Sequence, residues 1–495
     1  MTRPATIAVT STAILALILR IAASAQTGGF ETREVVEPPH FEDAIVRRDF
    51  QRCEPAGSVL LDERKDGKWV LRTKDWPTPL LNNIGNAPDL TYDPGLKGVY
   101  DIYLGSRATH FPVSVGLKMS DETQFTIITC PRETEEIHRD WEFCFRRAVQ
   151  LDGKKIIIHN LGQAVYVDYL KFVPIVGRTL KAQVAKDHVV ICQEKDKHFA
   201  FPGLAKLKDG SLAVVFRQGT AHIDPSGSVG FCRSTDGGRT WSPRRTIYDN
   251  PNVDERDPGI CQLANGTLVV SMASDGARTM RSTDNGLTWD KPTEAPVFTP
   301  HGPAELPDGR LYWCGITTPM GMNQVRIATS GDAGRTWRED QTIAVSLPFH
   351  QPWVRPFWDE PWATPLAGGR WLCLYRVDMD GYLYQNIATA GANDAPVPTR
   401  TQMWGCPPYI LKLADGRLLA LYGYRRPPWG IRACVSRDNG ATWDKDNEFI
   451  IRADGGHVDL GYPVAIEVEP GLVFAVYYMN HGGKECSIEG TWLKL

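Results

Sequence analysis

Three side chains that can transfer protons stand at equivalent positions of an internal repeat. Asp257, Glu360 and Tyr462 each lie nine residues before a glycine that predicts a β-hairpin turn between two apolar stretches. Carboxylates and phenols serve in enzymes as general acids, general bases and nucleophiles. Because equivalent positions of a repeat occupy equivalent places in a fold, these residues are the first candidates for a catalytic site.

A second set of equivalent positions carries two arginines. Arg217 and Arg376 each lie seven residues after the same hairpin glycine, in the first and fourth copies of the repeat. A guanidinium presents a rigid fork of donors that can bind a carboxylate through two hydrogen bonds. The spacing predicts that both arginines face a common centre, where they bind an anionic group of a ligand.

Two repeats set the frame for these positions. The pattern S-x-D-x-G-x-T-W occurs four times, and its aspartates are Asp236, Asp284, Asp332 and Asp438. Asp and Gly at these offsets make a tight turn, because Asp accepts backbone N–H groups ahead of it and Gly adopts positive φ. The hairpin glycines recur six times, at intervals of 43 to 60 residues. The sequence therefore predicts an all-β chain in which residues 187–495 form a six-bladed β-propeller.

The propeller is predicted to close through its first and last strands. Val189 to Gln193 precedes the first blade, and Thr491 to Leu495 ends the chain. Pairing of these two segments would make 189–193 the outer strand of the last blade. Such closure removes exposed strand edges.

The four aspartate turns also carry a resemblance to a known family. S-x-D-x-G-x-T-W is similar to the Asp-box, or bacterial neuraminidase repeat, and a six-bladed propeller with several such boxes resembles the sialidase superfamily. The resemblance covers about residues 187–495. It implies a glycoside hydrolase in which a tyrosine, rather than a carboxylate, attacks a sugar that carries its own carboxylate.

The resemblance implies a role for each of several residues. Tyr462 stands where the family has its nucleophile, and Glu360 stands where it has the glutamate that takes the tyrosine proton. Asp224, in the loop after the second strand of the first blade, stands where the family has its acid/base aspartate. The family's arginines that hold the substrate carboxylate correspond to Arg376 and to either Arg432 or Arg425.

One position departs from the family pattern. The family begins its first blade with an arginine two residues before a proline, whereas Phe199-Ala200-Phe201-Pro202 has Ala200 there. Arg217, on the next strand, is the candidate replacement; without one, sialic acid itself is in doubt as the substrate. The second blade offers instead the charged run Asp254 to Asp257, which adds Arg256 and Asp257 as candidate substrate contacts.

Three histidines lie near predicted strand starts: His222, His301 and His457. His301 is counted among the candidate substrate contacts. Each histidine is either an ordinary loop residue or, together with Tyr462, part of a site for proton abstraction. The second alternative favours a polysaccharide lyase or another exo-glycosidase.

The N-terminal segment is typical of an exported protein. Arg3 precedes an apolar stretch from Ile7 to Leu19, and Ala23-Ser24-Ala25 suits a signal-peptide cleavage site. We expect a signal peptide over 1–25, a linker over 26–40 and a secreted or periplasmic mature protein without stable membrane insertion. The alternative is an uncleaved anchor.

Residues 41–178 are predicted to form a separate β domain. Strand patterns occur at 98–105, 111–119, 125–129, 155–159 and 164–172, and no aspartate turn occurs among them. The pattern fits a β-sandwich of jelly-roll type. Such a domain either binds carbohydrate or acts as a packing spacer.

Composition narrows the range of partners. The formal net charge is −3, which implies no nucleic-acid partner. No Cys or His spacing typical of zinc occurs, so neither a metal site nor a cofactor is predicted. A glycan or polysaccharide is the expected substrate.

The sequence thus favours a secreted, sialidase-like glycoside hydrolase that releases a terminal, acidic sugar. A lyase or a different exo-glycosidase on the same propeller is the first alternative. A glycan-binding propeller without catalysis is the second, and it is favoured if Tyr462, Glu360 and Asp224 do not converge.

Overall fold

The computed structural model describes most of the chain after the N-terminal segment. The described residues are 28–36, 44–55, 59–63, 65–74, 79–106, 113–130, 141–162, 165–175, 179–317, 324–345, 358–377, 381–389 and 396–495. The predicted signal peptide at 1–25 lies outside them. Within these ranges, no helix has both the length and the apolar character needed to cross a membrane.

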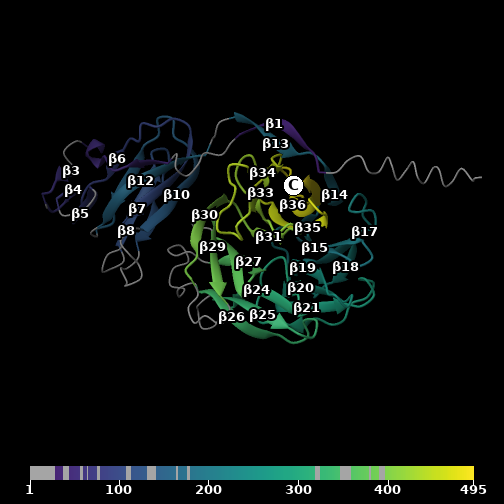
Figure 1. Ribbon diagram of the computed structural model, residues 1–495. Helices are drawn as coiled ribbons and strands as arrows, with labels where there is room; N and C mark the ends of the chain where they lie inside the picture. The colour runs from purple at the N-terminus through teal and green to yellow at the C-terminus, as the bar shows by residue number, and fades with distance from the viewer. Residues whose placement is uncertain are drawn as a thin grey trace, which may run out of the picture.

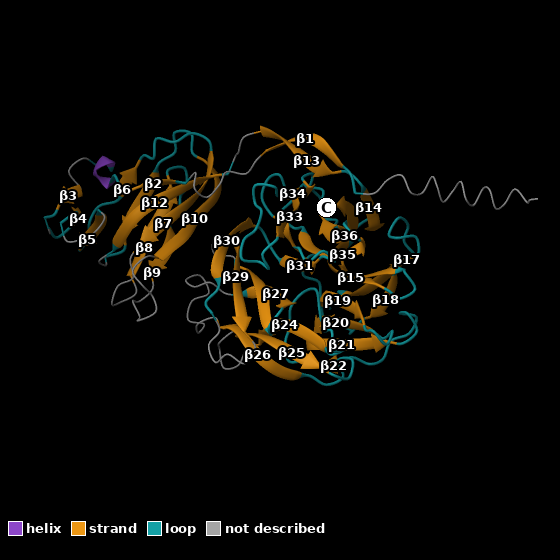
Figure 2. Cartoon of the chain, viewed as in Figure 1, coloured by secondary structure: helices purple, strands orange, loops and turns teal. Residues whose placement is uncertain are grey.

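Strands dominate the described residues (Figure 2). The one helix in this part of the chain is a 3-10 turn at Phe50–Arg52. The prediction of an all-β protein is therefore confirmed.

The N-terminal part consists of two sheets that share one hydrophobic core. Buried side chains of both sheets, among them Leu104, Phe172, Val115 and Ile158, belong to the same apolar cluster. Strands at 99–106, 113–119, 126–130, 156–160 and 166–174 confirm the predicted strands. The first sheet has the order β10-β7-β12-β5-β4-β3, with β2 beside β12, and contains β2 (Ile45–Arg47), β3 (Val59–Leu61), β4 (Lys68–Arg72), β5 (Leu80–Ile84), β7 (Val99–Ser106), β10 (Trp141–Gln150) and β12 (Tyr166–Pro174). The second has the order β6-β11-β8-β9 and contains β6 (Leu90–Tyr92), β8 (Val113–Met119), β9 (Thr126–Cys130) and β11 (Ile156–Asn160).

The rest of the chain forms a series of antiparallel sheets, which we number one to six. Sheets one to three contain β15 (His198–Lys206), β16 (Leu212–Gly219), β17 (Ser228–Ser234) and β18 (Arg245–Tyr248); β19 (Arg256–Gln262), β20 (Leu268–Ser274), β21 (Gly276–Ser282) and β22 (Thr293–Glu294); and β23 (Ala304–Glu305), β24 (Leu311–Thr317), β25 (Gln324–Ser330) and β26 (Arg338–Val345). Sheets four to six contain β27 (Asp359–Leu366), β28 (Arg370–Arg376), β29 (Tyr382–Thr389) and β30 (Thr399–Trp404); β31 (Pro408–Lys412), β32 (Leu418–Tyr424), β33 (Gly430–Ser436) and β34 (Phe449–Arg452); and β35 (Gly461–Glu469), β36 (Leu472–Met479), β37 (Ser487–Lys494) and β14 (His188–Cys192).

The first strands of these sheets contact one another in cyclic order. Strand β15 contacts β19, β19 contacts β23, β27 contacts β31, β31 contacts β35, and β35 returns to β15; β27 also contacts β24 of sheet three. Figure 1 shows β15, β19, β27, β31 and β35 together near the middle of this part of the molecule. Sheet six is completed by β14, which pairs with β37 so that Val189 lies opposite Gly490. This pairing confirms the predicted closure between the first and last strands.

The four aspartate turns are nearly identical in their hydrogen bonding. In each, the serine hydroxyl accepts the N–H of the glycine four residues on, at 2.8 Å. The aspartate accepts the N–H of the threonine four residues on, at 2.9 Å, and also the threonine hydroxyl. The structural role predicted for these aspartates is confirmed.

Each aspartate turn also packs on the sheet before its own. Trp241 of sheet one stacks on Phe474 of sheet six, with ring centres 6.2 Å apart. Trp289 of sheet two meets Phe231 of sheet one at 6.3 Å. The other two contacts are hydrogen bonds, from Thr279 to Gly334 O at 2.7 Å and from Trp443 to Gln385 at 2.7 Å. The turns therefore join neighbouring sheets as well as the third and fourth strands of their own sheet.

The segment predicted as a loose linker is partly a strand. Strand β1 (Phe30–Val36) pairs antiparallel with β13 (Thr179–Ala185), so that Arg33 lies opposite Ala182. Strand β13 in turn lies beside β34, with Val184 opposite Ile450. The expectation of an unstructured linker over 26–40 is wrong for these residues, because the two segments flanking the N-terminal sheets satisfy each other's backbone groups and extend sheet five.

Candidate functional site

The first strands share an unusual backbone conformation near their starts. Phe201, Asp257, Glu360 and Tyr462, all nine residues before a hairpin glycine, have φ values of 56°, 51°, 40° and 51°. In all four sheets the strand pairing shifts register at this place. In sheet three the position nine residues before the hairpin glycine is Pro300, and the next residue, His301, has a φ of 75°. Non-glycine residues in this region cost about 1 to 3 kcal/mol each and persist where the surroundings impose them, which is common at functional sites.

These bulges bring side chains from four sheets together. The Tyr462 hydroxyl donates a hydrogen bond to Oε1 of Glu360. The Tyr462 ring centre lies 4.6 Å from that of Phe201 and 6.2 Å from that of His301. The equivalent positions identified in the sequence therefore converge at the centre of the ring of sheets.

Arg376 completes a chain of polar contacts with this pair. Its Nη1 lies 2.8 Å from Oε2 of Glu360, and its strand places it opposite Asp359, the residue before Glu360. Tyr462, Glu360 and Arg376 thus form a phenol–carboxylate–guanidinium chain. The Glu360 carboxylate forms an ion pair with Arg376 through one oxygen and accepts a hydrogen bond from the Tyr462 hydroxyl through the other.

Asp257 adds a buried carboxyl group to the same region. Burial raises its pKa to about 7, and the charge of Glu360 acts in the same direction. Its Oδ1 is buried without a hydrogen-bond partner among the described residues. Burial also raises the pKa of Tyr462 well above its usual value, and the charges of Glu360 and Asp257 raise it further. Near neutral pH, Asp257 is therefore a group that can hold and give up a proton beside a protonated phenol.

Of the two alternative arginines, Arg425 lies at the site. Its guanidinium carbon is 5.4 Å from the centre of the Tyr462 ring. Arg432 is buried within sheet five, where its Nη1 donates to the carbonyl of Arg452 at 3.2 Å and its guanidinium packs over Tyr424 at 4.8 Å. Arg432 therefore belongs to the packing of its sheet.

Arg217 does not replace the arginine that is absent at Ala200. Its side chain has 0% exposure and binds both carboxylate oxygens of Asp254, at 2.6 and 3.0 Å. Its Nη1 donates to the carbonyl of Ala221 at 2.8 Å. The expectation that Arg217 contacts substrate is corrected for this reason: its donors are already used inside the protein.

Arg256, from the charged run Asp254 to Asp257, lies beside the ring of Phe201, which in turn contacts the ring of Tyr462. Its guanidinium carbon is 4.8 Å from the Phe201 ring centre, and its side chain is 26% exposed. It donates to the carbonyl of His222 at 2.6 Å and lies 3.2 Å from Asp254.

Asp224 is occupied in its own loop. Its carboxylate accepts the backbone N–H and the hydroxyl of both Thr220 and Ser226. These hydrogen bonds, led by those from Ser226, hold the pKa of Asp224 well below its usual value. Four hydrogen bonds thus hold Asp224 within its own loop, and Asp257 is a second carboxyl group that could fill the acid role.

His301 is buried, and neither ring nitrogen has a hydrogen-bond partner within the described residues. Burial lowers its pKa to about 3, which keeps the imidazole neutral. It borders a cavity of about 410 Å³ that runs between the first strands and is also lined by Trp362 and Tyr409. His301 therefore lies between Tyr462 and this cavity.

One cluster comes close to metal-ligand spacing among the residues described. Donor atoms of His198, Asp459 and Cys486 lie within 4.8 Å of one another. However, both oxygens of Asp459 already accept hydrogen bonds from histidine rings. Burial and the charge of Asp459 raise the pKa of the Cys486 thiol to about 12. The arrangement fits a hydrogen-bonded network better than a set of thiolate and carboxylate ligands.

Sequence reasoning missed Asp254, Asp459 and Tyr478 as parts of the site. Tyr478 shares the repeat position of Arg217 and Arg376, seven residues after the hairpin glycine, which is a usable signal. Asp459 lies only three residues before Tyr462. Its histidine partners, His198 and His222, come from sheet one, and no local pattern indicates that contact.

Comparison with known proteins shows similarity in structure. A protein of unknown function from Dyadobacter fermentans matches with a TM-score of 0.56 and 25% identity, over 63% of this chain and 98% of that one. The NanB sialidase from Streptococcus pneumoniae, in complex with 2-[(3-chlorobenzyl)ammonio]ethanesulfonate, matches with a TM-score of 0.50 and 10% identity, over 94% and 99%. The Hadza microbial sialidase Hz136 matches with a TM-score of 0.49 and 16% identity, over 82% and 95%. No family model and no curated protein matches the chain.

At these identities the likeness to the sialidases concerns the fold. It shows that this chain has the all-β architecture of NanB over nearly its whole length. Function must be argued from the site itself.

Proposed function

We propose that this protein is a glycoside hydrolase that removes a terminal acidic sugar from a glycan. In this proposal the six sheets are the blades of a propeller, the two N-terminal sheets are a β-sandwich, and the protein acts after export as a secreted or periplasmic enzyme. The fold shared with NanB supports the architecture. The argument for chemistry rests on the residues at the centre of the ring.

The contact of Tyr462 with Glu360 carries the proposal. A phenol is a weak nucleophile until a base removes its proton. Here the hydroxyl donates directly to a carboxylate that is held from its other side by Arg376. Two strained backbone positions, at Tyr462 and Glu360, maintain this contact. A residue pair that served only packing would not require a polar contact at two such positions.

The reaction follows from this geometry in two steps. First, the Tyr462 oxygen attacks the anomeric carbon while its proton passes to Glu360, and the glycosidic bond breaks. Asp257, whose pKa burial raises to about 7, gives its proton to the departing oxygen. Second, the Asp257 carboxylate takes a proton from water, which attacks the anomeric carbon. The bond to Tyr462 breaks, and the phenol recovers its proton from Glu360. Two displacements at one carbon retain its configuration.

The surrounding arginines favour an acidic sugar. Arg425 lies beside the Tyr462 ring and Arg256 beside the Phe201 ring. A carboxylate nucleophile would be repelled by an anionic substrate, whereas a phenol starts neutral. Guanidinium groups near a neutral nucleophile therefore suit a sugar that carries a carboxylate.

The experiment uses methylumbelliferyl glycosides of sialic acid, glucuronic acid and arabinofuranose, with the wild type and Tyr462→Phe. We expect turnover of an acidic glycoside and a loss in kcat of about a hundredfold or more in the variant. Tyr375→Phe is the matched control, because Tyr375 is buried in sheet four and donates to Asn386 at 2.8 Å. Full activity of Tyr462→Phe on every substrate would contradict the proposal.

A polysaccharide lyase is the second candidate, and His301 is the observation that favours it. A neutral imidazole beside Tyr462 could take a proton from the carbon next to a uronate carboxyl. Such a reaction gives an unsaturated product with ultraviolet absorbance and consumes no water. Release of that product from uronate polymers, with loss in His301→Gln, would favour the lyase over the hydrolase.

A further inference from the structure

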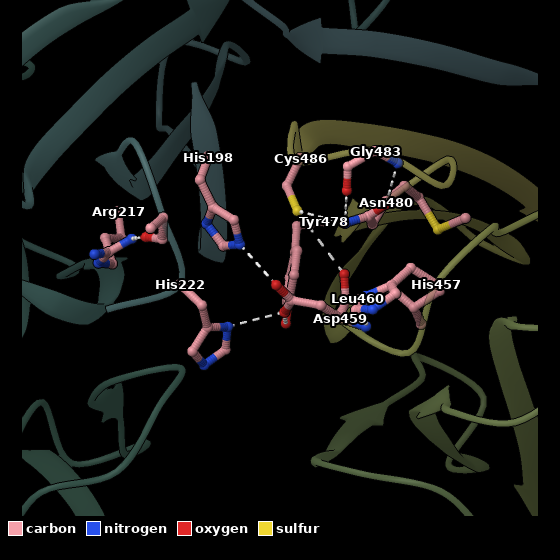
Figure 3. A network of polar contacts seen from close by, with 12 residues as sticks. His198, Arg217, His222, His457, Asp459, Leu460, Tyr478, Asn480, Gly483 and Cys486 are labelled. Carbon is pink, nitrogen blue, oxygen red and sulfur yellow. Dashed lines mark hydrogen bonds and ion pairs between the residues drawn. The ribbon is translucent and has the colours of Figure 1, made fainter. Parts of the chain in front are cut away.

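The Asp459 carboxylate joins side chains of sheet one, His198 and His222, to Tyr478 of sheet six. Asp459 accepts hydrogen bonds from Nε2 of His198 at 2.8 Å, Nδ1 of His222 at 2.9 Å and the hydroxyl of Tyr478 at 2.8 Å (Figure 3). Figure 3 shows both imidazole rings directed toward the Asp459 carboxylate. Burial acts to raise the pKa of Asp459, but the hydrogen bonds from His198 and His222 hold it well below its usual value. The carboxylate is therefore ionised at neutral pH.

On one side this network reaches Arg425. The Tyr478 hydroxyl donates its proton to Asp459 and accepts a hydrogen bond from Nη2 of Arg425 at 3.3 Å. The Nε of Arg425 donates to the carbonyl of Leu460, next to Asp459, at 2.9 Å. Arg425 is thus oriented by the Asp459–Leu460 segment through two contacts.

On the other side the network reaches Arg256. Nδ1 of His222 faces the Asp459 carboxylate at 2.9 Å, and the other ring nitrogen, Nε2, faces Arg256. Nη2 of Arg256 lies 3.4 Å from this Nε2, and Nη1 donates to the His222 carbonyl at 2.6 Å. His222 therefore contacts Asp459 through one ring nitrogen, and contacts Arg256 through the other ring nitrogen and its carbonyl oxygen.

The two arginines keep donors for a ligand. Within the described part of the chain, Nη1 of Arg425 and Nε of Arg256 make no hydrogen bond. The rings over which the two guanidiniums lie, those of Tyr462 and Phe201, are adjacent, with centres 4.6 Å apart. The cations therefore lie beside neighbouring rings at the reaction centre, and Arg217, the other candidate, is occupied by Asp254.

We propose that Asp459 is a positioning residue that holds Arg425 and Arg256 as a pair, and that this pair binds the carboxylate of a sugar acid in place of the arginine absent at Ala200. The inference rests on the proposed function and adds to it a source for the second cation, Arg256 of sheet two. Asp459 itself touches no reacting atom. Its effect passes through Tyr478 on one side and through His222 on the other.

The test measures binding separately from turnover. Isothermal titration of the full-length protein uses N-acetylneuraminic acid and glucuronic acid, each beside its methyl ester, which lacks the negative charge. For the acid that binds, Asp459→Asn is expected to weaken binding about tenfold to a hundredfold, because hydrogen bonds to charged groups are lost. Binding of the ester should change less than about threefold. In turnover assays the same variant should raise KM with little change in kcat.

Two further variants keep the test decisive. Tyr478→Phe breaks only the Arg425 side and should give part of the loss, and the two changes together should be less than additive. Asp454→Asn is the matched control, since Asp454 is a nearby carboxylate that pairs with Arg452 at 2.7 Å. If Asp459→Asn does not fold, Tyr478→Phe alone decides.

Equal losses for acid and ester would show a merely structural role and overturn the inference. Wild-type binding of neither acid would overturn it as well. Failure of the hydrolase proposal has a different signature: the acids bind and respond to Asp459→Asn, but no glycoside is turned over.

Discussion

The outer turns and the inner strand starts of the six sheets follow opposite rules. The four aspartate turns repeat the same side chains and the same hydrogen bonds, such as the 2.8 Å contact between serine and glycine. The strand starts repeat the same positive φ but carry different side chains, among them Phe201, Asp257, Glu360 and Tyr462. In the turns, the Ser and Asp side chains stabilise the backbone conformation through their own hydrogen bonds. At the strand starts, the packing of the six sheets around the centre imposes the positive φ.

Within the repeat, the aspartate turn therefore contributes to stability, and the start of the first strand contributes the side chains for chemistry. A position whose backbone is imposed from outside is free to vary its side chain, so four bulges can present an aromatic ring, two carboxyl groups and a phenol to one centre. His301 of sheet three, which also has positive φ, adds an imidazole. A turn that depends on its own Ser and Asp has no such freedom. Changes at strand starts should therefore affect activity, and changes at the turns should affect stability.

The largest effect is expected from Glu360→Gln. An amide cannot take the proton of Tyr462, so kcat should fall by about a hundredfold to ten-thousandfold, while the melting temperature changes little. Steady-state kinetics and thermal unfolding measure the two effects. The control is Glu305→Gln, a carboxylate that accepts the N–H of Ala264 in a turn; it should keep its activity. Unchanged kcat in Glu360→Gln would remove the base from the mechanism.

Asp257→Asn should show a loss that depends on the leaving group. Without an acid, a natural glycan should lose about a hundredfold in kcat/KM, and an aryl glycoside should lose much less, because its phenolate leaves without a proton. In the wild type, kcat/KM should fall as pH rises through about 7, where Asp257 gives up its proton. Equal losses on both substrates would argue against Asp257 as the acid.

Ser234→Ala should act on stability alone. The hydroxyl accepts the N–H of Gly238 at 2.8 Å inside a buried turn, and leaving that donor unpaired costs about 1 to 3 kcal/mol. Urea unfolding should show the decrease in the free energy of unfolding, and kcat should stay at the wild-type value. An activity loss without a stability loss would break the distinction between turns and strand starts.

The smallest effect is expected from His301→Leu. The imidazole has no hydrogen-bond partner within the described residues, so its removal should change the free energy of unfolding by less than about 1 kcal/mol at pH 7. On acidification His301 takes up a proton in the unfolded chain, whereas in the folded protein its pKa of about 3 keeps it neutral. Wild-type stability should therefore fall as pH drops below about 6.5, and the variant should lose less. Identical acid sensitivity would contradict this assignment.

Much of the fold could be predicted because its determinants are local. The aspartate turns and the hairpin glycines follow from residue types at fixed offsets, and the pairing predicted for 189–193 with the last strand is found at His188–Cys192. The convergence of Glu360 with Tyr462, residues 102 apart in the chain, could also be predicted, because the repeat converts sequence spacing into spatial equivalence. The linker could not, since β1 pairs with a strand about 150 residues later.

Roles that depend on neighbouring charges needed the tertiary structure. From the sequence, Arg217 and Arg376 are equivalent, yet Asp254 occupies the first and Glu360 pairs with the second. Asp224 and Asp257 are both plausible acids, yet four hydrogen bonds lower the pKa of Asp224 and burial raises the pKa of Asp257 to about 7. The sequence alone determined which positions face the centre, because residues at the same offset from each hairpin glycine occupy equivalent places in the six sheets. Only the tertiary structure decided which of them carry a usable proton or an available cation, because desolvation and ion pairing depend on partners from other sheets.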